Sequence, residues 1–166
     1  MNAGLASKKR FVIVLGSLTG LAALTIDMSL PAIPSMSRAL GVDTATGMQI
    51  VGFFMAGLAI GQLPAGLASD RFGRMPVLYA GMLLFMLAGL GCAMSRSIEV
   101  MLVCRFAQGI AAASSIVVSR AIVRDIASGR EAARLMSLMV MIFTMAPMVA
   151  PMIGACLLYT SPSPRD

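Results

Sequence analysis

Five apolar runs dominate the sequence, and each is about as long as a membrane is thick. They cover residues 11–33, 47–68, 76–94, 98–119 and 135 to about 158. A helix needs about 20 mostly apolar residues to cross the hydrocarbon core of a bilayer, where it satisfies its own backbone hydrogen bonds. Only 12% of the residues are charged, whereas a soluble domain carries about 25%. The sequence therefore predicts an all-α polytopic membrane protein with five transmembrane helices.

The basic residues of the predicted connections lie on alternate sides of the membrane. The N-terminal tail, residues 1–10, and the connections 69–75 and 120–134 contain nine of the Lys and Arg residues, whereas the connections 34–46 and 95–97 contain only Arg38 and Arg96. Basic loops stay in the cytoplasm, so we expect a cytoplasmic N-terminus in a bacterial inner membrane. The sequence pI of about 10.1 thus indicates topology and not nucleic-acid binding.

The sequence lacks the residue patterns of an enzyme. It contains no His, no cluster of metal ligands, no Ser motif with a base and no glycine pattern that would hold a nucleotide. We therefore predict that the protein is not an enzyme and uses no cofactor. A proton gradient is then the simplest energy source for work done within a membrane.

Two ionisable residues lie inside predicted spans, and both are about 9–10 Å below the outer boundary at 1.5 Å per residue. They are Asp27 in the first span and Arg105 in the fourth. A charge at this depth is costly and usually faces a partner or a wet cavity. One interpretation is a static ion pair that orients two helices. The other is that Asp27 exchanges a proton while Arg105 tunes its proton affinity. Gln108, one turn from Arg105, and Met28 are candidate residues of a substrate cavity.

The segment GLASDRFGRMPVL, residues 66–78, forms a charged turn between the second and third spans. Gly73 permits a turn that a Cβ atom would hinder, and Asp70 lies within reach of Arg71 and Arg74. On spacing alone this turn is either a charged anchor that fixes topology or a gate.

This segment resembles the loop signature of the major facilitator superfamily, G-x-L-a-D-r-x-G-r-k-x-x-l. The matching residues are Gly66, Asp70, Arg71, Gly73, Arg74 and Leu78, while Ala68 and Met75 depart from it. In that family the loop latches the two halves of a transporter on the cytoplasmic side. The resemblance therefore implies a latch role for Gly66, Asp70, Arg71, Gly73 and Arg74.

Four further segments resemble the drug/proton antiporters of this superfamily. RFAQGIAAA at 105–113 is similar to the fourth-helix motif, and APMVAPMIGA at 146–155 is similar to the fifth-helix antiporter motif, with Pro147, Pro151 and Gly154. DMSLPAIPSM at 27–36 and RAIVRDI at 120–126 resemble the bicyclomycin/chloramphenicol-resistance (Bcr/CflA) branch. The resemblance implies that residues 11–155 are the first five helices of an N-terminal six-helix half.

The resemblance also implies a function, which is proton-coupled efflux of small amphipathic drugs. The implied partners are the lipid bilayer, a drug substrate, protons and the missing C-terminal half. Two alternatives are a facilitator for a sugar or metabolite and a small membrane scaffold or partner subunit. Residues 156–166, CLLYTSPSPRD, resemble one reading frame of a sequencing adapter, so we expect them to be non-native and the truncated chain to be inactive.

Overall fold

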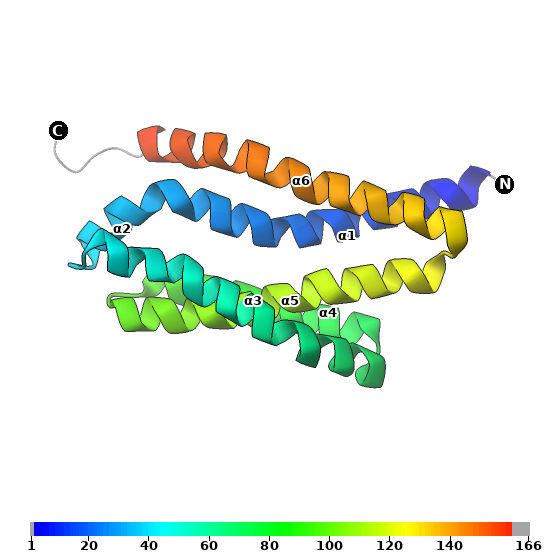
Figure 1. Cartoon of the computed structure of the whole chain (residues 1–166), viewed down its shortest axis with the longest axis horizontal. Helices are drawn as coiled ribbons and strands as arrows, with labels where there is room; N and C mark the ends of the chain where they lie inside the picture. Colours follow the sequence, from blue (N-terminus) through cyan, green and yellow to red (C-terminus); the bar gives the residue numbers. More distant parts are fainter. Residues whose placement is uncertain (1, 161–166) are drawn as a thin grey trace.

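The computed structural model describes the backbone of residues 2–160 and the side chains of residues 11–20 and 22–145. The helices are α1 (Asn2–Ser29), the short 3-10 helix η1 (Leu30–Ala32), α2 (Ile33–Ala39), α3 (Thr44–Phe72), α4 (Arg74–Met94), α5 (Ile98–Ile126) and α6 (Gly129–Thr160). Five of them are long and run antiparallel to their neighbours in sequence (Figure 1). The predicted all-α polytopic fold is confirmed.

Four segments within the described residues are long and apolar enough to cross a membrane. They are Phe11–Ala39, Thr44–Phe72, Arg74–Met94 and Ile98–Ile126. The fifth predicted span, residues 135–158, falls on α6, whose side chains after Met145 lie outside the described residues. The N-terminus, the α3–α4 turn and the α5–α6 turn all lie at one end of the bundle (Figure 1). This end contains all the connections that the sequence predicts to be basic.

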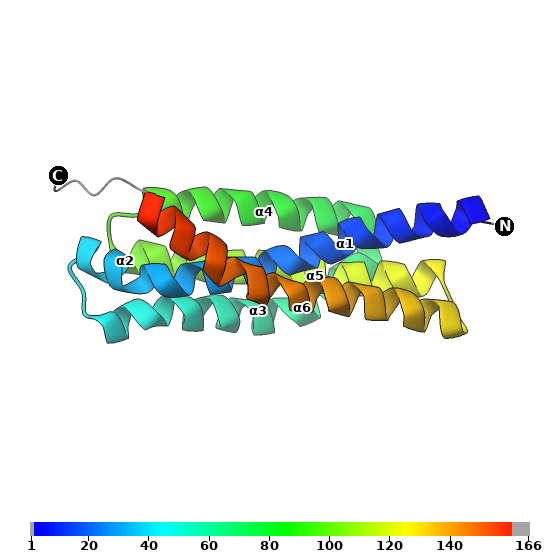
Figure 2. The same ribbon diagram turned by 90° about the horizontal axis from the view of Figure 1, so that it is seen from above.

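Helix α5 lies at the centre of one group of helices. It packs against both α3 and α4, which touch each other much less, while α1 packs mainly against α6 (Figure 2). Gly57 and Gly61 of α3 face the α5 backbone at Phe106 and Ile110, and Gly109 of α5 faces the α3 backbone. These glycines let two helix backbones approach closely. We call this contact the α3–α5 seam and define it by Gly57, Gly61 and Gly109, which allow the close packing of the two helices.

The predicted lengths of three connections were wrong. The outer connection predicted at 34–46 contains α2, so only residues 40–43 separate α2 from α3. The connection predicted at 120–134 shrinks to Ala127 and Ser128, and the one at 69–75 shrinks to Gly73. The reason is that an apolar run marks the hydrocarbon core, whereas a helix continues into the polar boundary of the membrane. The short connection at 95–97 is confirmed.

Candidate functional site

Asp27 lines a cavity between four helices. The cavity measures about 230 Å³, and its other lining residues are apolar: Ala22, Ala23, Ile26, Met55, Leu58, Ile116 and Phe143. They come from α1, α3, α5 and α6. Asp27 is half-buried at this cavity. Among the lining residues that the structure describes, Asp27 is therefore the only one whose side chain can carry a charge.

Arg105 of α5 lies near the C-terminal end of α1 and is half-buried there. Its Nη2 donates a hydrogen bond to Ser29 Oγ at 2.9 Å, and its Nη1 donates a long one of 3.5 Å to Gln108 Oε1. Its Nε is buried without a hydrogen-bond partner among the described residues. A buried donor without a partner is costly, so this guanidinium is incompletely satisfied.

The structure brings Arg105 to the end of α1 but does not pair it with Asp27. No ion pair joins these two side chains within the described part of the chain, and Arg105 instead bonds Ser29, two residues further along α1. Arg105 of α5 is therefore bonded to α1 at Ser29, and no hydrogen bond or ion pair of the described residues joins it to Asp27. The interpretation as a static Asp27–Arg105 pair has no support in this conformation.

The remaining predicted site residues differ in their surroundings. Gln108 is buried, and its Nε2 lies 3.3 Å from the position that a Cβ atom would take at Gly89 of α4. It therefore packs toward α4, while Met28 is half-buried on α1. The α6 backbone is helical at Pro147, Pro151 and Gly154, but their side chains lie outside the described residues.

Arg74 forms a charged node at the other end of the bundle. Its Nη1 donates to Asp70 Oδ1 at 2.5 Å and to Ser69 Oγ at 2.8 Å, and its Nε donates to Asp125 Oδ2 at 3.0 Å. These partners lie in α3 and α5, while Arg74 begins α4. We call these four residues the Arg74 node; it joins the ends of three helices.

Glycine sets the turn that makes this node possible. Gly73, the only residue between α3 and α4, has φ 94° and ψ 159°, a conformation that side chains with a Cβ atom rarely adopt. The turn was predicted from the sequence, as was the reach of Asp70 to Arg74. Arg71 is exposed and lies over the ring of Phe72, 5.5 Å from its centroid. Gly66 lies within α3, one turn before Ser69, whose hydroxyl donates to the Gly66 carbonyl oxygen at 2.9 Å.

Sequence reasoning missed two members of the node, Ser69 and Asp125. Asp125 lies 51 residues after Arg74 in the chain, so local spacing does not link them. A signal was present, because Asp125 is the one acidic residue in the otherwise basic RAIVRDI segment.

Comparison with known proteins identifies the family. The sequence model of the Major Facilitator Superfamily matches residues 15–165. The chain belongs to the Major Facilitator Superfamily. Among its relatives are an uncharacterised MFS-type transporter, YdgK, of Bacillus subtilis, 41% identical over 145 residues, and a chloramphenicol resistance protein of Pseudomonas aeruginosa, 38% identical over 145 residues. A bicyclomycin resistance protein homologue of Haemophilus influenzae is 33% identical over 144 residues.

These superfamily relatives are much longer than the present chain. The three alignments cover 87% of this chain but only 35–36% of each relative. The chain therefore spans about a third of the length of the superfamily transporters that it matches. The family assignment supports a multi-pass membrane protein, and the chain is similar to superfamily members named for chloramphenicol and bicyclomycin resistance.

Proposed function

We propose that this chain is the N-terminal part of a twelve-helix transporter that exports small amphipathic drugs in exchange for protons. Two kinds of observation support the proposal. The relatives include proteins named for resistance to chloramphenicol and bicyclomycin, and Asp27 is the only ionisable residue of an apolar cavity among the lining residues described. Asp27 at this cavity is the observation on which the mechanism depends.

In this mechanism Asp27 binds a proton from the outer side and releases it to the cytoplasm. An apolar environment favours the neutral acid, whereas a nearby cation favours the carboxylate. Arg105 has one hydrogen bond of ordinary length to Ser29, a long one to Gln108 and an unpartnered Nε. Asp27 and Ser29 are two residues apart and point to different sides of α1, so a rotation of α1 about its axis would be needed to exchange Ser29 for Asp27 as the partner of Arg105. Proton binding neutralises Asp27 and removes its attraction for Arg105. It would therefore favour the conformation in which Arg105 keeps Ser29 as its partner.

The Arg74 node supports the cytoplasmic part of the mechanism. We propose that Gly66, Asp70, Arg71, Gly73 and Arg74 act as the cytoplasmic latch, and that it contacts the second half of the transporter when the cytoplasmic side is closed. Within this chain the node already fixes α4 to α3 and α5. The helix-5 prolines, Pro147 and Pro151, would let α6 bend during the same movement, since each removes a backbone hydrogen bond from the helix.

The test is drug export by the complete transporter in membrane vesicles, with an imposed pH gradient. Asp27→Asn and Arg105→Ala are compared with Met28→Leu, a matched change on the same helix. We expect both charge variants to lose the dependence of export on the pH gradient, and Met28→Leu to keep it. Export that stays proton-dependent in both charge variants would contradict the mechanism. Gradient-driven movement of a sugar or metabolite, with no drug export, would instead favour a facilitator.

A separate measurement tests the extent of the chain. The source DNA is read across the junction between Ala155 and Cys156. We expect the native reading frame to continue into a sixth span and a second six-helix half, and to differ from CLLYTSPSPRD. A native frame that includes these eleven residues would contradict the adapter interpretation and favour a small partner subunit.

A further inference from the structure

A groove between α1 and α6 combines a basic rim with an apolar wall. It has a volume of about 760 Å³, and its lining includes Arg130, Arg134, Ile13, Leu138 and Met141. Arg130 and Arg134 are exposed, as are Ile13 and Met141, which are 47% and 57% exposed. We call this cavity the α1–α6 groove. Along α6 the charged lining residues come first, and the residues after Arg134 are apolar except for Ser137.

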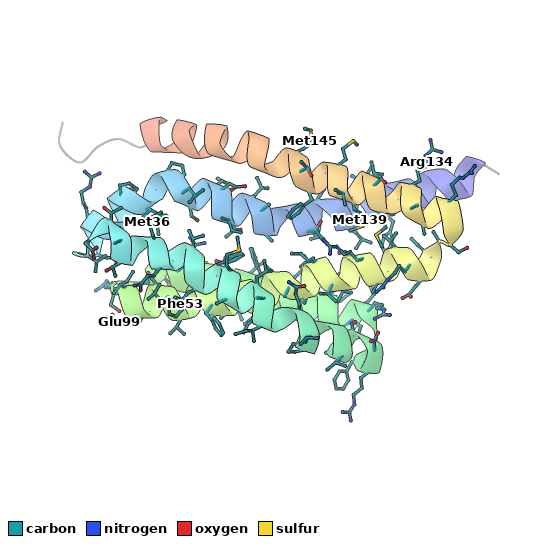
Figure 3. All side chains as sticks on the ribbon, viewed as in Figure 1. Met36, Phe53, Glu99, Arg134, Met139 and Met145 are labelled. Atoms are coloured by element: carbon teal, nitrogen blue, oxygen red, sulfur yellow. The ribbon has the colours of Figure 1, made fainter. Side chains whose placement is uncertain are left out.

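The residues of the α1–α6 groove are arranged in a fixed order along the axis of α6. Arg130 and Arg134 lie in the first two turns of the helix, and Leu138 and Met141 follow on the same face, so that the series covers about 16 Å at 1.5 Å per residue. Figure 3 shows Arg134 and Met145 pointing away from the bundle on one side of α6, while Met139 points toward α1. The outward face of α6 therefore changes from cationic to apolar with increasing distance from the α5–α6 turn.

The arginines at the rim take part in none of the ion pairs found among the described residues. The ion pairs of the described residues involve Arg74, and neither Arg130 nor Arg134 has an acidic partner in that part of the chain. Glu131 also lines the groove, but it is half-buried and has its own interaction. The rim therefore has an excess of positive charge. Arg74 at the same end of the bundle has two carboxylate partners, whereas Arg130 and Arg134 have none among the described residues.

We infer that the α1–α6 groove binds an anionic phospholipid, with its phosphate between Arg130 and Arg134 and one acyl chain along Ile13, Leu138 and Met141. A phospholipid has the same sequence of charge followed by hydrocarbon that the groove presents. Basic pockets between transmembrane helices on the cytoplasmic side are suited to such head groups. The inference rests on the proposed orientation, which places this end of α6 at the cytoplasmic leaflet.

The test is native mass spectrometry of the complete transporter in nanodiscs that contain phosphatidylglycerol or phosphatidylcholine. No drug and no pH gradient are present. Near a charged surface each basic residue contributes about a 5-fold change in affinity. We therefore expect Arg130→Gln and Arg134→Gln each to weaken phosphatidylglycerol retention by about 5-fold, and the double variant by roughly 30-fold. The matched control is Arg38→Gln/Arg96→Gln, which removes two exposed arginines from the opposite end and should leave retention unchanged.

Several outcomes would overturn the inference. Equal retention of phosphatidylglycerol by the double variant and the wild type would exclude the two arginines as the site. Equal retention of phosphatidylcholine by the wild type would exclude selection by charge. Displacement of the lipid by soluble glycerophosphoglycerol at the same concentration would indicate a phosphate site without an acyl-chain groove. A complete transporter that retains phosphatidylglycerol but exports no drug would contradict the proposed function and leave the lipid site intact. Failure of the proposed function can thus be distinguished from failure of the lipid inference.

Discussion

Arg74 and Arg105 belong to the same helix bundle but differ in how fully their guanidinium groups are hydrogen-bonded. Arg74 lies at the polar end, where Asp70, Asp125 and Ser69 accept hydrogen bonds from two of its nitrogens. Arg105 lies inside a predicted span, where a serine and a glutamine are its partners and Nε has none among the described residues. The first arrangement is suited to fixing helices in place. The second arrangement leaves a donor of Arg105 free to bond another group, which a residue that changes partners during a transport cycle needs.

The largest expected effect separates the two arginines by function. In the complete transporter, Arg105→Gln should change the coupling between proton and drug by about 5- to 150-fold, the usual range for coupled sites. Arg74→Gln should lower the maximal rate of export without moving its pH dependence, because the node lies far from the cavity of Asp27. The measurement is drug export at a series of pH gradients. A shifted pH dependence in Arg74→Gln would remove the distinction between the two arginines.

The α3–α5 seam is the rigid frame between these two sites, and a glycine pair tests it. A Cβ atom at Gly57 would meet the backbone of Phe106, whereas a Cβ atom at Gly52 would meet nothing within 4 Å. Gly57→Ala should therefore cost about 1–3 kcal/mol through overpacking. Gly52→Ala should stabilise the helix by up to about 1 kcal/mol, because alanine is the better helix former. Unfolding in mixed detergent measures both, and equal effects would show that the seam is not close-packed.

A second glycine pair tests the turn that holds the Arg74 node. Gly73 has a φ of 94° and Gly66 is helical, with only an ordinary contact to Val117 at the position of a Cβ atom. Gly73→Ala should cost about 1–2 kcal/mol of conformational strain, and Gly66→Ala should be neutral or slightly stabilising. The same unfolding assay applies. If Gly66→Ala proved the more harmful, its role would lie in contact with the second half and not in this fold.

The smallest expected effect concerns the strength of the Arg74 node itself. Arg74→Gln should lower the thermal stability only slightly, because Asp70 and Asp125 are both exposed and salt screens such pairs. The difference from the wild type should shrink as the ionic strength rises from about 0.1 M to about 1 M. Arg71→Gln is the control, since Arg71 contacts the Phe72 ring. A deficit in Arg74→Gln that is independent of salt would indicate that hydrogen bonds to Ser69 dominate the node.

The sequence predicted the parts of the structure that depend on local pattern. Apolar length identified the helices, and the glycine of the α3–α4 turn was found at Gly73 because a φ of 94° excludes most other residues. The Asp70–Arg74 pair could be predicted because the two residues are only four positions apart in the sequence. The link to Asp125 was not, because a contact across 51 residues depends on how α4 and α5 pack. Likewise, the similar depths predicted for Asp27 and Arg105 led us to expect Arg105 near this part of α1, and Arg105 bonds Ser29 there. The choice of Ser29 as the partner depends on the rotation of α1 about its own axis.

The central position of α5 has a consequence for the order in which the bundle is assembled. Helices α3 and α4 are joined by one glycine, yet each makes most of its contacts with α5 and few with the other. During synthesis α3 and α4 enter the membrane first, with the faces that α5 will cover still in contact with lipid. A helical hairpin of this kind gains little from pairing with itself. The insertion of α5 is therefore the step at which this group of helices becomes a compact unit, and a chain that ends before residue 98 leaves α3 and α4 without their common partner.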